Sequence, residues 1–263
     1  MSLLAEKRIV VIGGTTGIGL SAAQAFVDEG AKIVVVGRNK ENVAQAKSQL
    51  GENVQALSAD ARDPDTAVNA INLCFGKFGG FDGLYHVAGG SGRKMGDGPL
   101  HELSLDGWNK TLELNLTSLM LSNQAAVKKF LELKKAGTIL NMGSVLGFSP
   151  SPKYFYTHAY AAAKSAIIGF SKSVAAYYAK ENIRVNVIAP AVAETPMAQR
   201  AANDETILSF IKSKQPLDNG RIGKPGDMNG LAIYFMSDQS SFTTGQVIAV
   251  DGGWSISEGQ YSL

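Results

Sequence analysis

Short apolar runs alternate with longer amphipathic stretches along most of this chain. The runs are rich in Val and Ile and end at glycine or polar residues. Such runs are typical of strands that are buried on both faces of a parallel sheet. The pattern predicts strands at residues 8–12, 32–36, 54–58, 84–87, 138–142, 183–188 and 246–250.

Stretches with apolar residues every three or four positions lie between several of these runs. This spacing places apolar side chains on one face of a helix. Gly30 ends one such stretch at residue 29, and Asp63-Pro64 provides a cap and a first-turn proline for another. Further helices are expected at residues 106 to about 133, 159–178 and 225–236. The alternation predicts an α/β protein, and the absence of an internal linker predicts a single domain, residues 1–263.

One connection is much longer than the others. Residues 191–223 contain no clear strand and one short helical pattern, at 205–214. Long connections at strand ends are often active-site lids. We therefore expect a substrate lid at about residues 191–223.

A glycine-rich turn follows the first strand directly. It reads Gly13-Gly14-Thr15-Thr16-Gly17-Ile18-Gly19 and opens a helix. Glycines let the backbone approach a pyrophosphate closely, and a helix N-terminus offers free N–H groups and a partial positive charge. The alternative is a tight turn without a ligand, which three spaced glycines between such regular elements disfavour.

The end of the second strand indicates which dinucleotide is bound. An NAD site usually places Asp or Glu here, against the ribose 2′-hydroxyl. This chain has Gly37-Arg38 instead, and no acidic residue precedes Glu41. Because a guanidinium binds a 2′-phosphate and a carboxylate repels it, we favour NADP(H) over NAD(H). A solvated loop arginine is the alternative.

Tyr160 and Lys164 form the main candidate for acid–base chemistry. Four residues apart on a helix, they leave the same face one turn from each other. An ammonium near a phenol favours the phenolate and lowers its pKa from about 10. Ser144, after the fifth strand, can bond a substrate carbonyl. Taken alone, the pair favours the alternative, an ordinary amphipathic helix surface with a snorkelling lysine.

Composition excludes several function classes. The net charge of +2 gives no pull toward nucleic acid or membrane, and no stretch is long enough to span a bilayer. The single cysteine, Cys74, cannot form an internal disulfide and is expected to be a buried thiol. With no visible targeting segment, a cytoplasmic protein is expected. No metal site is expected.

Two loops flank the predicted site. Arg93 and Lys94 lie in the glycine-rich loop 90–107, where they could meet an anionic substrate, although a solvated surface is favoured. Phe148, Tyr154, Phe155 and Tyr156 precede the Tyr160 helix and predict either a pocket wall or simple loop packing.

These motifs together resemble the short-chain dehydrogenase/reductase family over nearly the whole chain. The matching residues are Gly13-x-x-x-Gly17-x-Gly19, Ala88-Gly89, Asn115, Ser144, Tyr160-x-x-x-Lys164, the region of Pro190, and Thr244-Gly245-Gln246 with Val250-Asp251-Gly252-Gly253. The resemblance implies a three-layer doubly wound (Rossmann) fold, with a seven-stranded, mostly parallel sheet and helices on both faces. It also implies a homotetramer or homodimer.

The resemblance further implies a catalytic tetrad. Tyr160 would pass a proton to or from the substrate oxygen, and Lys164 would lower the pKa of Tyr160 and hold the nicotinamide ribose. Ser144 would orient the carbonyl, and Asn115 would anchor a water in a proton relay. The implied cofactor residues are Gly13, Thr15, Thr16, Gly17, Ile18 and Gly19 at the pyrophosphate, Arg38, Asp60 and Ala61 at the adenosine, Ala88 and Gly89 at a ribose, and Pro190, Val192 and Thr195 at the nicotinamide.

The chain departs from the family pattern at several positions. His86-Val87 stands where the family often has Asn-Asn, Ile12 where it often has Thr, and Ala191 where Gly is usual. His86 is expected to be a structural substitution, with the central-strand hydrogen bonds supplied elsewhere or lost.

Three functions follow from these residues. The first is an NADPH-dependent reductase (or dehydrogenase) that interconverts a carbonyl and a secondary alcohol, with 3-oxoacyl thioesters among its candidate substrates. The second is an NAD-preferring sugar or polyol dehydrogenase. The third is a scaffold that binds NADP(H) without turnover.

Overall fold

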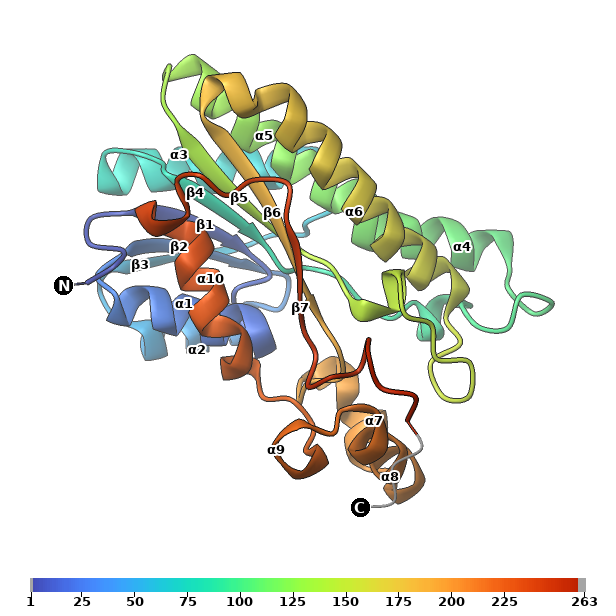
Figure 1. Cartoon of the computed structure of the whole chain (residues 1–263). Helices are drawn as coiled ribbons and strands as arrows, with labels where there is room; N and C mark the ends of the chain where they lie inside the picture. Colours follow the sequence, from blue (N-terminus) through green and yellow to red (C-terminus); the bar gives the residue numbers. More distant parts are fainter. Residues whose placement is uncertain (1, 260–263) are drawn as a thin grey trace.

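The computed structural model describes residues 2–259 of the chain. Its strands form one sheet in the order β3-β2-β1-β4-β5-β6-β7, and every neighbouring pair is parallel (Figure 1). The predicted doubly wound, seven-stranded sheet is confirmed, and in the described residues it is parallel throughout. The strands are β1 (Arg8–Ile12), β2 (Lys32–Gly37), β3 (Val54–Ser58), β4 (Gly83–His86), β5 (Gly137–Met142), β6 (Ile183–Pro190) and β7 (Val247–Val250).

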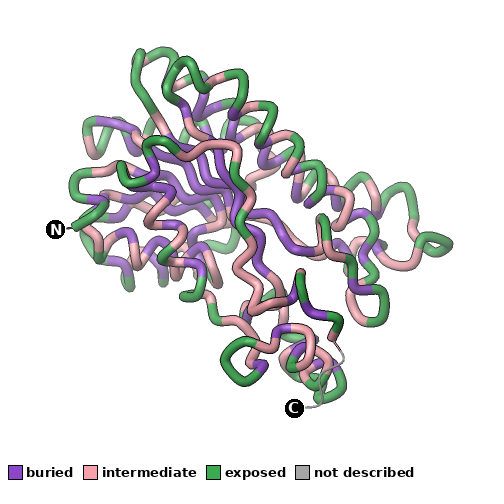
Figure 2. Tube along the Cα trace, viewed as in Figure 1, coloured by how far each residue is buried: buried purple, intermediate pink, exposed green. Residues whose placement is uncertain are grey.

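The continuous apolar runs arise because both faces of the sheet are covered. Successive side chains of a strand point to opposite faces. In β1, Ile9 and Val11 enter one hydrophobic core, and Val10 and Ile12 enter the other. Figure 2 shows the resulting buried layer in the centre of the molecule.

Helices form the two outer layers. Helices α1, α2 and α10 pack on one face of the sheet, and α3, α5 and α6 on the other (Figure 1). Cys74 of α3 is fully buried, as predicted, and burial raises the pKa of its thiol to about 12. The α-helices are α1 (Gly17–Asp28), α2 (Lys40–Leu50), α3 (Pro64–Phe78), α4 (Leu105–Leu112), α5 (Ser118–Glu132), α6 (His158–Tyr178), α7 (Gln199–Ala202), α8 (Glu205–Lys214), α9 (Leu217–Gly220) and α10 (Asn229–Met236).

No helix of the described residues is both long and apolar enough to cross a membrane.

Single helical turns connect several of the helices and strands. The turns are η1 (Arg93–Met95), η2 (Glu113–Thr117), η3 (Val145–Gly147), η4 (Ala179–Glu181), η5 (Pro196–Ala198), η6 (Pro225–Met228) and η7 (Asp238–Ser240), of which η2 is π-helical and the others are 3₁₀.

The long helix predicted from residue 106 to about 133 is not continuous. The π-helical turn η2, which contains Asn115, separates α4 from α5. Side chains compete here for helical carbonyls: Asn115 donates to Thr111, and Ser118 donates to Leu114. Side-chain bonds of this kind widen or bend a helix locally. The prediction of one uninterrupted helix was therefore wrong at this position.

Helix α2 was not predicted. Its sequence is mostly polar, and only Ala46 and Leu50 are buried. A capping signal was present, because the Asn39 side chain accepts a hydrogen bond from the Asn42 N–H at 2.8 Å. A short polar helix has little periodicity to reveal it.

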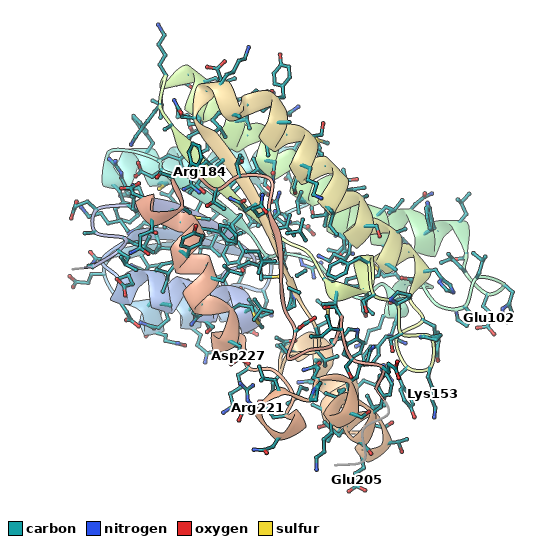
Figure 3. All side chains as sticks on the ribbon, viewed as in Figure 1. Glu102, Lys153, Arg184, Glu205, Arg221 and Asp227 are labelled. Atoms are coloured by element: carbon teal, nitrogen blue, oxygen red, sulfur yellow. The ribbon has the colours of Figure 1, made fainter. Side chains whose placement is uncertain are left out.

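The segment at 191–223 forms its own small cluster. The predicted helix at 205–214 is observed as α8, and Ile207 and Ile211 from it pack with Ala201. The far end is tied to the body of the protein, because the Arg221 guanidinium pairs with both carboxylate oxygens of Asp227 at 2.7 and 2.9 Å (Figure 3).

Strand order reverses between β1 and β4, since β2 and β3 lie on one side of β1 and the later strands on the other. In open α/β sheets, ligands bind beyond the carboxyl ends of the strands at this point. The predicted site residues follow these strand ends.

Candidate active site

A cleft of about 1080 Å³ lies along the carboxyl ends of the central strands. Its walls come from the glycine turn, the ends of β2 to β6, the start of α6 and the segment 191–223. Most predicted site residues line it: Gly13, Thr15, Thr16, Gly17, Ile18, Arg38, Asp60, Ala61, Ala88, Gly89, Ser144, Tyr160, Lys164, Pro190, Val192 and Thr195. Gly19 and Asn115 do not line the cleft.

The glycine turn has no room for side chains. A Cβ at Gly13 would lie 2.6 Å from the backbone nitrogen of Ala88, and one at Gly19 would lie 2.0 Å from the Gly13 carbonyl oxygen. Gly17 has φ of +54°, and a side chain there would meet Thr195. Gly19 therefore acts by close packing inside the turn, and the cleft surface is left to its neighbours.

The N-terminus of α1 opens into this cleft. Thr16 is its N-cap residue and makes no side-chain capping bond, so the first N–H groups of the helix keep their hydrogen-bonding capacity. An uncapped helix N-terminus at a glycine turn suits an anionic pyrophosphate. The cradle thus fits the dinucleotide that the sequence predicts.

Arg38 and Asp60 lie at one end of the cleft. The Asp60 carboxylate accepts hydrogen bonds from the Arg62 guanidinium at 2.7 and 3.1 Å, and these hold the pKa of Asp60 below its ordinary value. Arg38 is more distant, with 4.0 Å between its Nη1 and Asp60 Oδ2, and its side chain is 60% exposed. Because Arg62 largely balances Asp60, Arg38 remains available to another anion.

Tyr160 and Ser144 meet near the middle of the cleft. Burial raises the pKa of the Tyr160 phenol, and a hydrogen bond with the Ser144 hydroxyl opposes this rise. Desolvation outweighs this hydrogen bond, so the net direction is a rise, and the lowering of this pKa by Lys164 stays a prediction. Tyr160 is therefore a protonated phenol at neutral pH, suited to donating a proton.

Lys164 lies one helical turn behind Tyr160. Its ammonium nitrogen is 5.5 Å from the centroid of the Tyr160 ring and donates a hydrogen bond to the Met142 carbonyl at 2.8 Å. The side chain is buried, and desolvation lowers its pKa to about 7. Lys164 can thus gain or lose a proton near neutral pH.

Asn115 lies behind Gly89 and the cleft wall. Its amide nitrogen donates to the carbonyls of Gly90 and Thr111, both at 2.9 Å, and its Oδ1 accepts from the Gly90 N–H at 3.1 Å. The side chain is fully buried, and both amide hydrogens are used. In this structure Asn115 fixes the backbone after β4, and the water-anchoring role stays a prediction.

His86 is fully buried beside the site and does not line the cleft. Its Nδ1 lies 2.7 Å from the Ser122 hydroxyl, and its Nε2 lies 3.5 Å from the Ser118 hydroxyl. Burial lowers the pKa of the imidazole to about 3, so the ring is neutral. The two serines of α5 supply the central-strand contacts, which supports the prediction of a structural residue.

The aromatic segment before α6 contributes less to the cleft than predicted. Only Phe155 of the four aromatic residues lines it, while Phe148 and Tyr156 are 47% and 40% exposed. Arg93 and Lys94 do line the cleft, and Arg93 is half-buried. The preference for a solvated surface was therefore wrong for Arg93, because its guanidinium donates to the Tyr154 carbonyl and lies over the Tyr156 ring.

Sequence reasoning missed several lining residues. They share no motif, since most come from the far segment 191–223 or from the C-terminal turn. Trp254 carried a weak signal, a large apolar residue directly after Gly252-Gly253. The missed residues include Asn39, Asn42, Leu114, Met197, Gln199, Arg200 and Trp254. Among residues 2–259 there is no group of three His, Cys, Asp or Glu side chains that could hold a metal ion.

The sequence of this chain is similar to those of known dehydrogenases and reductases. The family model adh_short_C2, described as enoyl-(acyl carrier protein) reductase, matches residues 13–255. The cis-4-hydroxycyclohexanecarboxylate dehydrogenase of Sinomonas cyclohexanicum is 31% identical over 252 residues, which are 95% of this chain and 97% of that protein. A 2,5-dichloro-2,5-cyclohexadiene-1,4-diol dehydrogenase of Sphingobium indicum is 31% identical over 255 residues, 97% of this chain and 99% of that protein.

Solved structures agree with these relatives. A short-chain type dehydrogenase/reductase from Mycobacterium ulcerans superposes with a TM-score of 0.88 at 27% identity, covering 96% of this chain and 91% of that one. Its counterpart from Mycobacterium marinum also gives 0.88, at 26% identity, covering 96% and 97%. With the parallel sheet, the glycine turn and the Tyr160–Lys164 pair, these matches show that the chain is an NAD(P)-dependent oxidoreductase acting on alcohol groups, a member of the short-chain dehydrogenase/reductase family.

Proposed function

We propose that this protein interconverts a secondary alcohol and a ketone with NADP(H) as the hydride carrier. The observation that carries the proposal is the meeting of Tyr160, Ser144 and Lys164 in one cleft with the glycine turn and Arg38. The nicotinamide supplies or accepts the hydride when it is bound. The protein's own residues then have to handle one proton and orient one oxygen.

Tyr160 and Ser144 perform these two tasks in the proposal. The phenol, kept protonated by burial, donates its proton to the carbonyl oxygen during reduction, and it accepts the proton back during oxidation. The Ser144 hydroxyl bonds the same oxygen and fixes its position. Lys164, with a pKa of about 7, can return a proton to the phenolate after reduction.

The preference for NADP(H) rests on the charges around Arg38. Asp60 is paired with Arg62 at 2.7 Å and so offers little repulsion to a phosphate, whereas the Arg38 side chain is exposed and 4.0 Å from Asp60. Asn39 and Asn42 line the same end and add hydrogen-bonding groups. A 2′-phosphate meets the exposed Arg38 guanidinium here, whereas the one carboxylate at this end, that of Asp60, already accepts hydrogen bonds from Arg62.

A cyclic secondary alcohol, or its ketone, is the substrate class that we favour. Two similar proteins are named for substrates with hydroxyl groups on six-membered rings. The cleft beyond Tyr160 is lined by Phe155, Met197 and Trp254, whose flat or flexible apolar surfaces suit a ring. A 3-oxoacyl thioester remains the second class in the proposal.

We also propose the setting in which the enzyme works. Residues 191–223 act as a lid, because Thr195 lies against the glycine turn and α8 carries its own apolar cluster. The assembly is a homotetramer or a homodimer formed through helices α5 and α6, which pack against each other at Leu119 and Ile167 (Figure 1). A reducing, cytoplasmic location fits the single buried cysteine. Light scattering on the purified protein measures the assembly.

The test of the function is a substrate panel. Purified protein is mixed with NADPH or NADH and with cyclohexanone derivatives, 3-oxoacyl thioesters, 2-enoyl thioesters and a sugar or polyol series in the oxidative direction. Loss of absorbance at the nicotinamide band with a ketone, faster with NADPH, is the expected result. Turnover of polyols with NAD would favour the alternative dehydrogenase. Tight NADPH binding without any turnover would favour the scaffold.

A further inference from the structure

Two arginines from separate segments converge at the substrate end of the cleft. Arg93 comes from the loop after β4, and Arg200 comes from α7 in the segment 191–223. Their guanidinium Nη2 atoms donate to the same backbone oxygen, that of Tyr154, at 3.1 and 2.9 Å. Both side chains line the cleft that contains Tyr160. A carbonyl oxygen carries only a partial charge, so it does not neutralise two guanidiniums.

No carboxylate in the described part of the chain forms an ion pair with Arg93 or Arg200. Among residues 2–259, the arginines that form ion pairs are Arg8, Arg38, Arg62 and Arg221. Asp97 is close enough to influence Arg93, but its two oxygens accept the N–H groups of Ala159 and Tyr160. Of the described residues that line the cleft, Asp60 alone is acidic, and it lies at the opposite, Arg38 end. Lys94 adds a third positive charge.

The pair carries an electrostatic cost that an anion would relieve. Burial, followed by repulsion from Arg200, lowers the pKa of Arg93. A guanidinium begins so far above neutral pH that both groups remain charged. Arg93 is half-buried and Arg200 is exposed, so two like charges meet at the mouth of the cleft and attract a negatively charged ligand group.

Aromatic rings hold the two guanidiniums in place. Arg93 lies 5.3 Å from the centroid of the Tyr156 ring, and Arg200 lies 5.7 Å from that of Phe155. Phe155 in turn packs edge-on against Trp254 at 5.5 Å. Guanidiniums already held against aromatic rings lose little further freedom when they bind a ligand, which favours two parallel hydrogen bonds to a planar anion.

We propose that Arg93 and Arg200 bind a carboxylate carried by the substrate, so that the enzyme acts on a hydroxy acid or oxo acid. The apolar walls of Phe155 and Trp254 then accommodate the ring or chain between the carboxylate and the reacting carbon. This inference rests on the proposed function, because it names the substrate class of the same site. A phosphate on a thioester carrier presents similar chemistry, and the experiment separates the two.

The test begins with binding, which needs no turnover. Protein saturated with NADP is titrated calorimetrically with cyclohexanecarboxylate and with its neutral isostere, cyclohexanecarboxamide. We expect the carboxylate to bind at least about 10-fold more tightly, and Arg200→Gln to remove that advantage while changing amide binding less than about 2-fold. Arg200→Lys keeps the positive charge but cannot donate two parallel hydrogen bonds, so it should restore part of the preference for the carboxylate. Equal binding of acid and amide by the wild type overturns the proposal.

Lys153 provides the matched control. Its ammonium lies over the Tyr154 ring at 5.2 Å, on the loop preceding α6 (Figure 3), but it does not line the cleft. Lys153→Met should therefore leave carboxylate binding unchanged. If Lys153→Met weakens binding as much as Arg200→Gln does, general surface charge explains the effect and the proposal fails.

Turnover then separates this inference from the proposed function. With NADPH, 4-oxocyclohexanecarboxylate should be reduced with a kcat/KM at least about 10-fold above that of its methyl ester, with the difference mainly in KM and lost in Arg200→Gln. Equal use of acid and ester keeps the proposed function and overturns the carboxylate site. If turnover of a coenzyme A thioester requires Arg200 and the acid is not preferred over its ester, the two arginines bind a phosphate. That result also overturns the carboxylate site. Carboxylate-selective binding without turnover of any ketone supports the site and contradicts the function.

Discussion

The Asp97 carboxylate holds the backbone of Tyr160. One Asp97 oxygen accepts the Tyr160 N–H at 2.9 Å, and the other accepts the Ala159 N–H at 3.0 Å. Asp97 is buried and belongs to the loop after β4, whereas these two N–H groups belong to the first turn of α6. Thr157, the N-cap residue of α6, makes no side-chain capping bond. A residue 63 positions away in the sequence therefore supplies the cap for the helix that carries the proposed acid.

Replacing Asp97 should loosen this helix start. Asp97→Ala removes two charge-assisted hydrogen bonds and a favourable charge at a helix N-terminus, so we expect a loss of about 2 kcal/mol in the free energy of unfolding. We also expect kcat to fall about 10-fold, since a small displacement of a reacting group is costly. Asp97→Asn keeps one hydrogen-bond acceptor, so its stability and kcat should lie between those of the wild type and of Asp97→Ala. Chemical denaturation and steady-state kinetics measure both effects, and wild-type values for Asp97→Ala would contradict the positioning role.

Glu102 serves as the control for Asp97. It lies on the same loop, its side chain is 69% exposed, and Figure 3 shows it at the outer edge of the molecule. Glu102→Gln should change neither stability nor kcat. Equal effects of the two substitutions would mean that loop charge, and not the cap, matters.

Arg38 should decide the choice of dinucleotide. Arg38→Asp places a carboxylate where the proposal puts a 2′-phosphate, so the Kd for NADPH should rise about 10- to 100-fold while NADH binding stays equal or improves. Fluorescence titration with both cofactors measures the change. The control is Lys40→Asp, the same charge change at an exposed position outside the cleft. Unaltered NADPH affinity in Arg38→Asp would leave the NADP preference without support.

The Tyr160 hydroxyl should be needed for chemistry and dispensable for cofactor binding. Tyr160→Phe removes the proton donor, and general acid–base groups typically contribute 10²- to 10⁴-fold, so we expect kcat to fall about 1000-fold with NADPH affinity unchanged. Ser144→Ala should lose about 100-fold through the missing hydrogen bond. Tyr177→Phe, an exposed position on the same helix, is the control. Activity retained by Tyr160→Phe in a folded protein would refute the assigned acid.

Stability should fall in mild acid because of His86. The folded-state pKa of His86 is lowered to about 3, so as pH drops below about 6.5 the unfolded chain binds a proton that the folded protein does not. The free energy of unfolding should therefore decrease toward acid by about 1.4 kcal/mol per pH unit from this group, from pH 6.5 to about 5, before carboxylates contribute.

Substitution isolates the His86 contribution. His86→Asn carries no titrating group, so denaturation curves between pH 6.5 and 5 should show a shallower decline than the wild type. His101→Asn, at an exposed position, should keep the wild-type profile. Parallel profiles for wild type and His86→Asn would show that the buried imidazole does not cause the decline.

The local sequence was sufficient to predict the strands and helices that carry the main motifs. The apolar run at 8–12 identified β1, and the glycine turn after it identified the cradle, because strand burial and left-handed glycine conformations leave signals within a few residues. The spacing of Tyr160 and Lys164 placed both on one helix face for the same reason. Helix α2 left too weak a periodic signal, and the π-turn at Asn115 depended on side chains that bond to carbonyls.

Tertiary structure alone decided how these residues behave together. The cap from Asp97 and the convergence of Arg93 with Arg200 join segments far apart in sequence, and no local pattern encodes such contacts. The direction of the Tyr160 pKa also required the fold. Sequence spacing predicted a lowering by the nearby ammonium, but burial in the assembled cleft desolvates both groups and raises the pKa of the phenol. Desolvation depends on everything packed around a group, and only the folded chain specifies that.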